Sequence, residues 1–353
     1  MKRTTFIWAA LLVLLPVEAA AIEPVRQGQE EALVRGVYAE ARLWLLSDAG
    51  QLFSVRPGDT TDRQEFVPGN APIFDICQSP SGFVALSAKG NTPAEWIVWA
   101  RGNGQWSQQM TLPAKGEVPL ALMCGIDGET VLTATRLIAV SGQKIKATQL
   151  SEKVGYGVAS TLMTSNAVYV GFNRGEWGGG LNRIDRVAGK VSVISDAPPH
   201  GCGGLLNASC DPVNGLVVAP GQPDCIAAAV GLVHIVTNGR IVKVCGGRIK
   251  LLYRRQIGQR YPNISLSDDD AYPTMAFFGL AASGDHLLAV GLDGLYLIGA
   301  DGKAMSSPLP VLKKVGPFRI SFERRDVAIV LTTENERDSV SGAVPMMVAT
   351  PGR

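Results

Sequence analysis

The chain has 353 residues, of which 46% are hydrophobic and 18% charged, and its formal net charge is only +2. So small an excess gives no electrostatic basis for binding nucleic acid or a membrane surface. The 40 glycines and 21 prolines follow no collagen period, and so many turn-forming residues are typical of an all-β chain.

The first residues have the pattern of a secretory signal peptide. A basic start, Met1–Arg3, precedes an apolar run from Phe6 to Pro16 and small residues at Ala19–Ala21. An uncleaved membrane anchor is the alternative, but the apolar run is shorter than the ~20 residues that span a bilayer. We therefore predict a signal peptide over residues 1–21, one mature domain over residues 22–353 without a membrane span, and a periplasmic or secreted location.

One pattern recurs along the mature chain: an apolar segment, a turn, a second apolar segment, a glycine-rich turn and two further strands. Ala39–Val55 and Leu162–Asn173 open two copies, and Val217–Arg240 and Leu280–Lys303 show the pattern most clearly. Their spacing of roughly 48 residues matches the period of four-stranded propeller blades. The copies begin near residues 32, 72, 118, 157, 217, 277 and 318. We predict a β-propeller of seven four-stranded blades, with six or eight as alternatives.

The last copy is incomplete. Strands predicted at Phe318–Arg324, Asp326–Thr333 and Gly342–Thr350 leave no room for a fourth strand before Arg353. An unpaired sheet edge invites aggregation. We therefore predict that a segment within Ile22–Glu31 supplies the outermost strand of the last blade.

Two connections between copies are long, residues 196–216 and residues 246–276. Connections of this length in a compact domain are usually functional or crosslinked. The first contains His200, Cys202 and Cys210, and the second contains Arg254, Arg255 and the run Asp268-Asp269-Asp270.

The six cysteines favour disulfides, because an even number occurs in a chain predicted to be exported and zinc-ligand spacing is absent from the sequence. Cys77 and Cys124 lie near the ends of the first strands of neighbouring copies, so they could bridge if their Cα atoms come within ~7 Å. Cys202–Cys210 and Cys225–Cys245 would then remain. This connectivity is one of 15 that six cysteines allow.

The segment Gly175-Glu176-Trp177-Gly178-Gly179-Gly180 joins two predicted strands within one copy. In a propeller, such second-to-third loops and the fourth-to-first connections emerge on one face, so we expect this segment near both long connections. Trp177 could supply a stacking or cation–π surface and Glu176 a hydrogen-bond acceptor or cation ligand. Alternatively, Trp177 covers a blade edge and the glycines only shape the loop. The candidate ligand-binding residues are Arg174, Glu176, Trp177, His200, Arg254, Arg255, Asp268, Asp269 and Asp270.

Evidence for a cofactor or for catalysis is weak. The aspartate run 268–270 could bind calcium through oxygen ligands, but it lacks the alternating spacing that wraps a cation, which favours a solvated acidic loop. No nucleophile elbow, phosphate loop or dinucleotide fingerprint occurs in the sequence. We expect a soluble, monomeric binding module without a cofactor, for a small ligand or a protein partner. The alternative is a hydrolase or lyase that uses Glu176 with a carboxylate from 268–270, with calcium as the possible ion.

The segment Leu288-Ala-Val-Gly-Leu-Asp-Gly-Leu-Tyr-Leu297 resembles the repeats of bacterial ligand-binding sensor propellers of the two-component-regulator type, and Ala167–Phe172 and Arg42–Phe53 match them in part. The resemblance covers about half of the chain. It implies the propeller fold and no particular function, because no kinase region follows the repeats.

Overall fold

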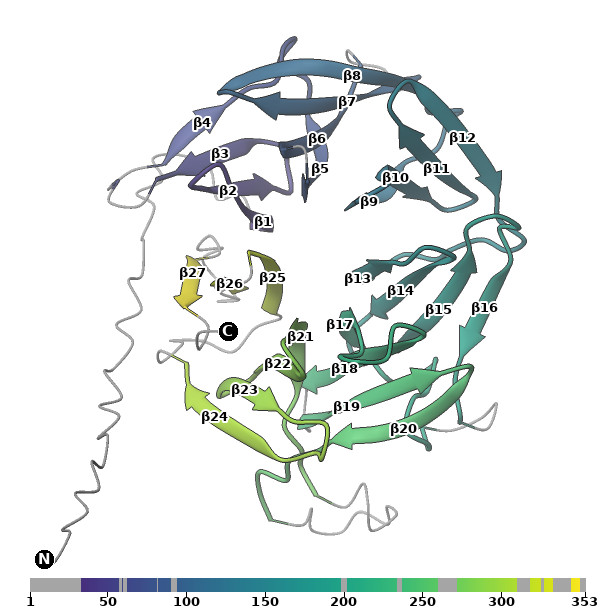
Figure 1. Cartoon of the computed structure of the whole chain (residues 1–353), viewed down its shortest axis with the longest axis vertical. Coiled ribbons are helices and arrows are strands. Elements are labelled where there is room, and N and C mark those ends of the chain that lie inside the picture. The colour runs from purple at the N-terminus through teal and green to yellow at the C-terminus, as the bar shows by residue number, and fades with distance from the viewer. Residues whose placement is uncertain are drawn as a thin grey trace, which may run out of the picture.

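Figure 1 shows the computed structural model of the chain as a ring of β-sheets around a central axis. The structure describes residues 33–56, 59, 62–80, 82–89, 94–197, 202–233, 237–259, 272–309, 318–324, 327–332 and 344–349. None of these residues belongs to a helix long and apolar enough to cross a membrane. The prediction of an all-β propeller is confirmed.

Six blades are antiparallel sheets of four strands in chain order. The first three contain β1 (Leu33–Ala39), β2 (Arg42–Ser47), β3 (Leu52–Val55) and β4 (Arg63–Glu65); β5 (Ile73–Ser79), β6 (Gly82–Ala88), β7 (Glu95–Gly102) and β8 (Gln105–Pro113); and β9 (Pro119–Gly125), β10 (Gly128–Thr133), β11 (Arg136–Ser141) and β12 (Lys144–Gln149). The next three contain β13 (Val158–Met163), β14 (Ala167–Asn173), β15 (Gly179–Asp185) and β16 (Val191–Ile194); β17 (Val213–Val218), β18 (Cys225–Val233), β19 (Thr237–Cys245) and β20 (Arg248–Tyr253); and β21 (Phe277–Ser283), β22 (His286–Gly291), β23 (Gly294–Ile298) and β24 (Ala304–Pro308).

The number of four-stranded blades is a correction to the prediction, because the described residues form six rather than seven. The remaining strands, β25 (Phe318–Arg324), β26 (Val327–Thr332) and β27 (Val344–Ala349), form a sheet of three. This last sheet lies between the sixth and first blades, since β25 packs against both β21 and β1 (Figure 1). The segment Ile22–Glu31, predicted to complete it, lies outside the described residues.

The predicted copy starts agree with the first strands to within one residue, except in the fifth blade, where residue 217 was predicted and β17 begins at Val213. Asn214 and Gly215 are a typical turn pair, yet here they lie inside the strand. Gly215 is needed for close packing between blades, because a Cβ atom there would lie 2.7 Å from the Leu280 backbone nitrogen.

The predicted boundaries of both long connections also need correction. The first, predicted as 196–216, ends where β17 begins at Val213, and the second, predicted as 246–276, starts only after β20. The strand β20 was missed although Arg248–Leu251 alternates between polar and apolar residues. Gly246 and Gly247 have φ angles of 55° and 81°, which form the two-residue turn that closes the β19–β20 hairpin.

The hydrophobic core lies between neighbouring blades. Trp44 of the first blade stacks on Phe83 of the second with ring centroids 4.4 Å apart, and Trp106 meets Trp44 edge-on. Similar buried clusters join each following pair of blades. Because side chains fill the space between the sheets, the blades form a rigid frame for the loops at their ends.

Three disulfides connect the chain as predicted. Cys77–Cys124 joins the innermost strands of the second and third blades with a Cα–Cα distance of 5.8 Å. Cys225–Cys245 links β18 to β19, and Cys202–Cys210 lies in the connection before β17. Disulfides persist in oxidising compartments, so they fit an exported protein.

Candidate functional site

A cavity of about 510 Å³ lies near the axis, where the innermost strands begin. Its wall includes residues from β1, β5, β9, β13, β17, β21 and β25, each of which is the strand nearest the centre of the ring (Figure 1). Ligand-binding cavities usually measure roughly 300–1,000 Å³. The cavity therefore has the size of a site for a small ligand.

A β-bulge occurs at the second residue of the innermost strand in each four-stranded blade, where the register with the neighbouring strand skips one residue. Bulges turn a side chain away from its regular direction and often lie next to binding sites. All of the bulged residues line the cavity. We call them the bulge ring: Val34, Phe74, Leu120, Ala159, Asn214 and Phe278.

Charged side chains on the wall compensate each other. Asp75 accepts hydrogen bonds from the backbone N–H of Ile76 at 2.8 Å and from that of Leu122, on the next blade, at 2.7 Å. The Nε atom of Arg35 lies 3.7 Å from the Asp75 carboxylate. This carboxylate is thus held in place from three sides, and it joins the first three blades at the cavity wall.

On the fourth and fifth blades, neutral side chains connect the wall. The Ser160 hydroxyl donates to the Val213 carbonyl at 3.0 Å, and Asn214 donates to the carbonyls of Gly231 and Phe277 at 2.8 and 3.1 Å. The bond from Ser160 to Val213 and the bond from Asn214 to Phe277 each reach the next blade along the chain. The wall is therefore fixed by hydrogen bonds before any ligand arrives.

Asn214 also holds the predicted glycine-rich loop against the cavity. Its Oδ1 atom accepts a hydrogen bond from the Asn173 amide at 2.7 Å, and Asn173 Oδ1 accepts from the Gly175 N–H at 2.8 Å. Asn173, Gly175 and Asn214 all line the cavity. The loop between β14 and β15 is thus part of the cavity rim.

The glycines of this loop permit contact with the connection before β17. A Cβ atom on Gly178 would lie 2.3 Å from the Ser209 carbonyl oxygen, and one on Gly180 would lie 2.7 Å from the Ala208 Cα atom. Both glycines have positive φ angles, 107° and 101°, and the Gly180 N–H donates to the Asp211 carbonyl at 2.7 Å. Predicted proximity of this loop to the first long connection is confirmed.

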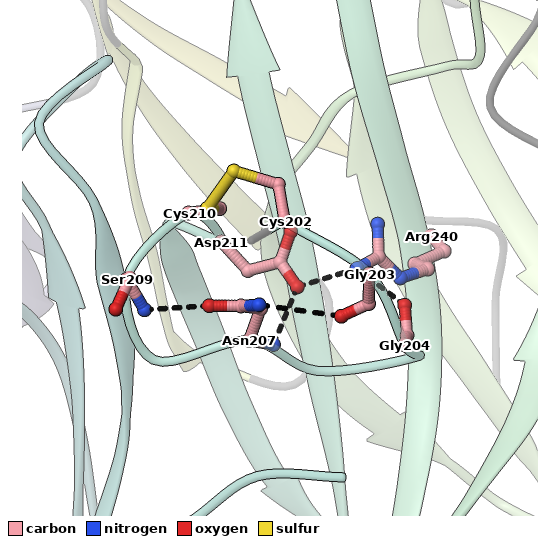
Figure 2. The surroundings of a disulfide bond; sticks show 8 residues. All are labelled: Cys202, Gly203, Gly204, Asn207, Ser209, Cys210, Asp211 and Arg240. Carbon is pink, nitrogen blue, oxygen red and sulfur yellow. Dashed lines mark hydrogen bonds and ion pairs between the residues drawn. A yellow bond between two sulfur atoms is a disulfide. The ribbon is translucent and has the colours of Figure 1, made fainter. Parts of the chain in front are cut away.

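That connection is held by a disulfide and a buried ion pair (Figure 2). Arg240 of β19 pairs with Asp211, and the two residues are 2% and 5% exposed. Arg240 also donates to the Leu205 carbonyl at 2.7 Å, and Asp211 accepts from the Asn207 N–H at 2.7 Å. Because Cys202–Cys210 closes the same segment, the backbone that receives the glycine loop is fixed.

Two aromatic rings stand exposed next in the chain to the fourth blade's lining residues, although neither lines the cavity itself. Trp177 is 78% exposed and Tyr156 is 74% exposed, so Trp177 does not cover a blade edge. The Arg174 guanidinium lies 5.3 Å from the ring centroids of Tyr156 and Phe172, and its Nε atom donates to the Tyr156 carbonyl at 3.3 Å. Glu176 is exposed and forms a backbone bridge with Arg174.

In the second connection, Arg255 is held by residues of the sixth blade. Arg255 pairs with Asp293 at 3.2 Å and contacts the Tyr296 hydroxyl, which donates to Asp293 at 2.5 Å. Burial, together with the hydrogen bond to Asp293, raises the pKa of Tyr296 well above its usual range. Neither Arg255 nor Arg254 lines the cavity. Their predicted place beside the glycine loop stays a prediction.

His200 and Asp268–Asp270 lie outside the described residues, so their predicted role in binding stays a prediction. Within the described part of the chain, no group of three or more histidines, cysteines, aspartates or glutamates could hold a metal ion. The wall residues Asp75, Ser160, Asn173 and Asn214 were missed from the sequence. Their only signal is a polar residue at the start or end of an otherwise apolar strand.

The sequence matches no protein-family model and no curated protein in the comparisons. Solved structures do resemble the fold. YCF48 bound to D1 peptide has a TM-score of 0.56 at 13% identity, over 96% of this chain and 97% of that one. YCF48 from Cyanidioschyzon merolae has a TM-score of 0.51 at 14% identity, over 94% of this chain and 99% of that one.

The extracellular domain of a hybrid two-component system from B. thetaiotaomicron has a TM-score of 0.54 at 16% identity. The match covers 94% of this chain but only 40% of that one. The resemblance to sensor propellers seen in the repeats is thus confirmed. At such low identity these similarities establish the fold alone.

Proposed function

We propose that this protein is an exported binding module whose ligand occupies the cavity inside the bulge ring and contacts Trp177 at the rim. The observation that carries the proposal is the cavity of about 510 Å³, walled by side chains of seven innermost strands. Hydrogen bonds between blades hold this wall in place. A preformed wall lowers the entropy cost of binding.

Binding explains the chemistry of the wall better than catalysis does. Asp75 is the one carboxylate among the lining residues described, and both of its oxygens already accept backbone hydrogen bonds. A general acid or base must instead exchange a proton with the substrate. Among proteins of similar fold, one is a sensor's extracellular domain and another is bound to a peptide, which supports a binding role.

The location follows from the leader and the disulfides. We expect cleavage after Ala21, which would release the domain into the periplasm or the medium. Sequencing the N-terminus of the exported protein tests this expectation. A mature chain that still begins at Met1 would contradict it.

The binding role is tested by a thermal-shift screen of the mature protein with sugars, lactones, amino acids, short peptides and metal ions. The matched variant is Ala159→Trp, because Ala159 belongs to the bulge ring and a larger side chain there fills the cavity. A compound that raises the melting temperature of the native protein should have no effect on this variant. An equal shift in both proteins, or no shift with any compound, would contradict the proposal.

Two further variants separate binding from turnover. Trp177→Ala should abolish the ligand-induced shift while leaving the unliganded protein as stable as before, because the ring is exposed. Glu176→Gln should have a mild effect. A loss of about 100-fold in turnover of the same compound in Glu176→Gln would instead favour the hydrolase or lyase alternative.

A further inference from the structure

We infer that the ligand of this site is a small organic carboxylate, with its apolar body inside the bulge ring and its carboxylate on Arg174. The inference rests on the proposed binding function. It follows from the apolar character of the ring, from the charge of Arg174 and from the place of this residue between two residues that line the cavity.

The bulge ring presents mainly apolar side chains to the cavity. Five of its members carry no polar side-chain atom, and Val158 and Ile320 add further apolar surface to the wall. The remaining member, Asn214, is 9% exposed and uses both ends of its amide in bonds to the protein. The ring therefore favours the apolar part of a ligand.

Arg174 lies next to the rim in the chain, although its own side chain is not among those that line the cavity. It stands between Asn173 and Gly175, which both line the cavity. Its Cγ atom would be 3.0 Å from a Cβ atom on Gly157, another lining residue. Gly157 has a φ angle of 82°, so this close packing and the backbone conformation both exclude a side chain there. The base of Arg174 is thus fixed against the rim.

The charge of Arg174 is not compensated within the described part of the chain, where it forms no ion pair. Arg35, Arg136 and Arg240 each face a carboxylate at Asp75, Glu117 and Asp211. Arg174 instead stacks on Tyr156 and Phe172. A stacked guanidinium keeps a planar edge of N–H groups that matches a carboxylate, and little side-chain entropy is lost when it binds.

A single uncompensated cation suits a ligand with one negative charge. A phosphate monoester would bring nearly two charges and a large hydration shell to an apolar ring, and both are costly to desolvate. Tyr156, on which this arginine stacks, and Trp177, which follows it closely in the chain, are both exposed and offer flat apolar surface. A carboxylate with an apolar tail therefore fits better than a phosphate or a neutral sugar.

The test compares two probes of equal shape, phenylbutyrate and its neutral amide phenylbutyramide, by calorimetric titration of the mature protein at about pH 7.5, where a carboxylic acid is ionised. The acid should bind at least about tenfold more tightly than the amide, because a charge-assisted bond replaces a neutral one. Arg174→Gln should remove this advantage and leave the amide's affinity within about twofold. Arg174→Lys should keep part of the advantage, since it retains the charge but loses the planar fork.

A third probe distinguishes the source of the carboxylate. N-acetyl-glycyl-glycyl-phenylalanine carries the same chemistry at the end of a peptide. If it binds about tenfold more tightly than phenylbutyrate, the carboxylate belongs to a peptide terminus and the small-acid assignment is overturned.

Failure of this inference can be distinguished from failure of the binding function. Equal affinity for acid and amide, with binding abolished by Ala159→Trp, would keep the cavity as a binding site and overturn the carboxylate. If phenylbutyrate still bound more tightly than phenylbutyramide in Arg174→Gln, the assignment of the carboxylate to Arg174 would also be overturned. If no compound of the screen and no probe bound, both proposals would fall.

Discussion

The connections that enter the third and fifth blades differ in length but are held by the same device. In the third blade, Arg136 at the start of β11 pairs with Glu117 at 2.9 Å and donates to the Ala114 carbonyl at 2.8 Å. In the fifth blade, Arg240 near the start of β19 pairs with Asp211 and donates to the Leu205 carbonyl at 2.7 Å. Each arginine therefore holds the connection that leads into its own blade.

The difference lies in what the fifth blade adds. Its connection carries a disulfide and the turn at Asn207 (Figure 2). Its backbone also receives Gly178 and Gly180. The short connection of the third blade has none of these within the described residues. The arginine device is thus a general way to hold a loop, and the added parts place the glycine loop at the cavity rim.

The largest expected effect comes from breaking the arginine device of the fifth blade. Arg240→Met leaves the Asp211 carboxylate buried without its cation, which should cost about 3–5 kcal/mol of the free energy of unfolding. Arg136→Met is the matched control and should cost less, because the Glu117 side chain is 19% exposed and can regain water. Urea denaturation measures both values. If both variants lost the same free energy of unfolding, the burial of the partner carboxylate would not determine the size of the loss.

A smaller effect is expected where the glycine loop meets the long connection. Gly180→Ala places a Cβ atom 2.7 Å from the Ala208 backbone at a φ angle of 101°, and it should destabilise the protein by about 2–3 kcal/mol. Gly175→Ala is the control, because its φ angle is 62° and a Cβ atom there would meet nothing within 4 Å. It should cost only about 1 kcal/mol, from backbone strain. Urea denaturation of both variants tests this prediction. If Gly175→Ala lowered the free energy of unfolding as much as Gly180→Ala, the contact with Ala208 would not explain the loss.

The smallest effect concerns pH in the third blade. Burial raises the pKa of Glu117, but hydrogen bonds from Thr133, Thr135 and Arg136 outweigh it and hold the pKa below its usual 4.5. The stability that this gives is present above the unfolded pKa and is lost as the pH falls through the folded pKa. Glu117→Gln should therefore reduce the loss of stability between about pH 5 and pH 3. An unchanged acid dependence of the unfolding free energy would rule out this contribution.

Local patterns predicted the fold well and the site poorly. Turn residues and apolar alternation located the blade starts and the disulfide partners, because hairpins and neighbouring blades follow the chain order. The start of β17 failed because Gly215 serves contact with Leu280 of the next blade rather than a turn. The packing of one blade against the next cannot be predicted from a single local segment of the sequence.

The cavity illustrates the same limit. A bulge is defined by the register between two strands, so Phe74 or Asn214 could not be recognised as a cavity residue from its own neighbours in sequence. Similarly, the glycines at 178–180 indicated a bend from the sequence. The structure shows that they are needed because the backbone of residues 208–211 lies too close for a Cβ atom. Trp177 was selected because an aromatic ring in a glycine-rich loop could supply a stacking surface, and its role in binding stays a prediction.

The bulge ring also bears on how the protein can change. Its side chains come from separate blades, at one equivalent position in each, and they line the cavity, while Phe278 also belongs to a buried cluster between blades. Changes at distant positions without shared contacts combine nearly additively. For the proposed binding role, this means that ligand preference can be retuned one blade at a time while the scaffold persists, which makes the ring a natural starting point for engineered receptors.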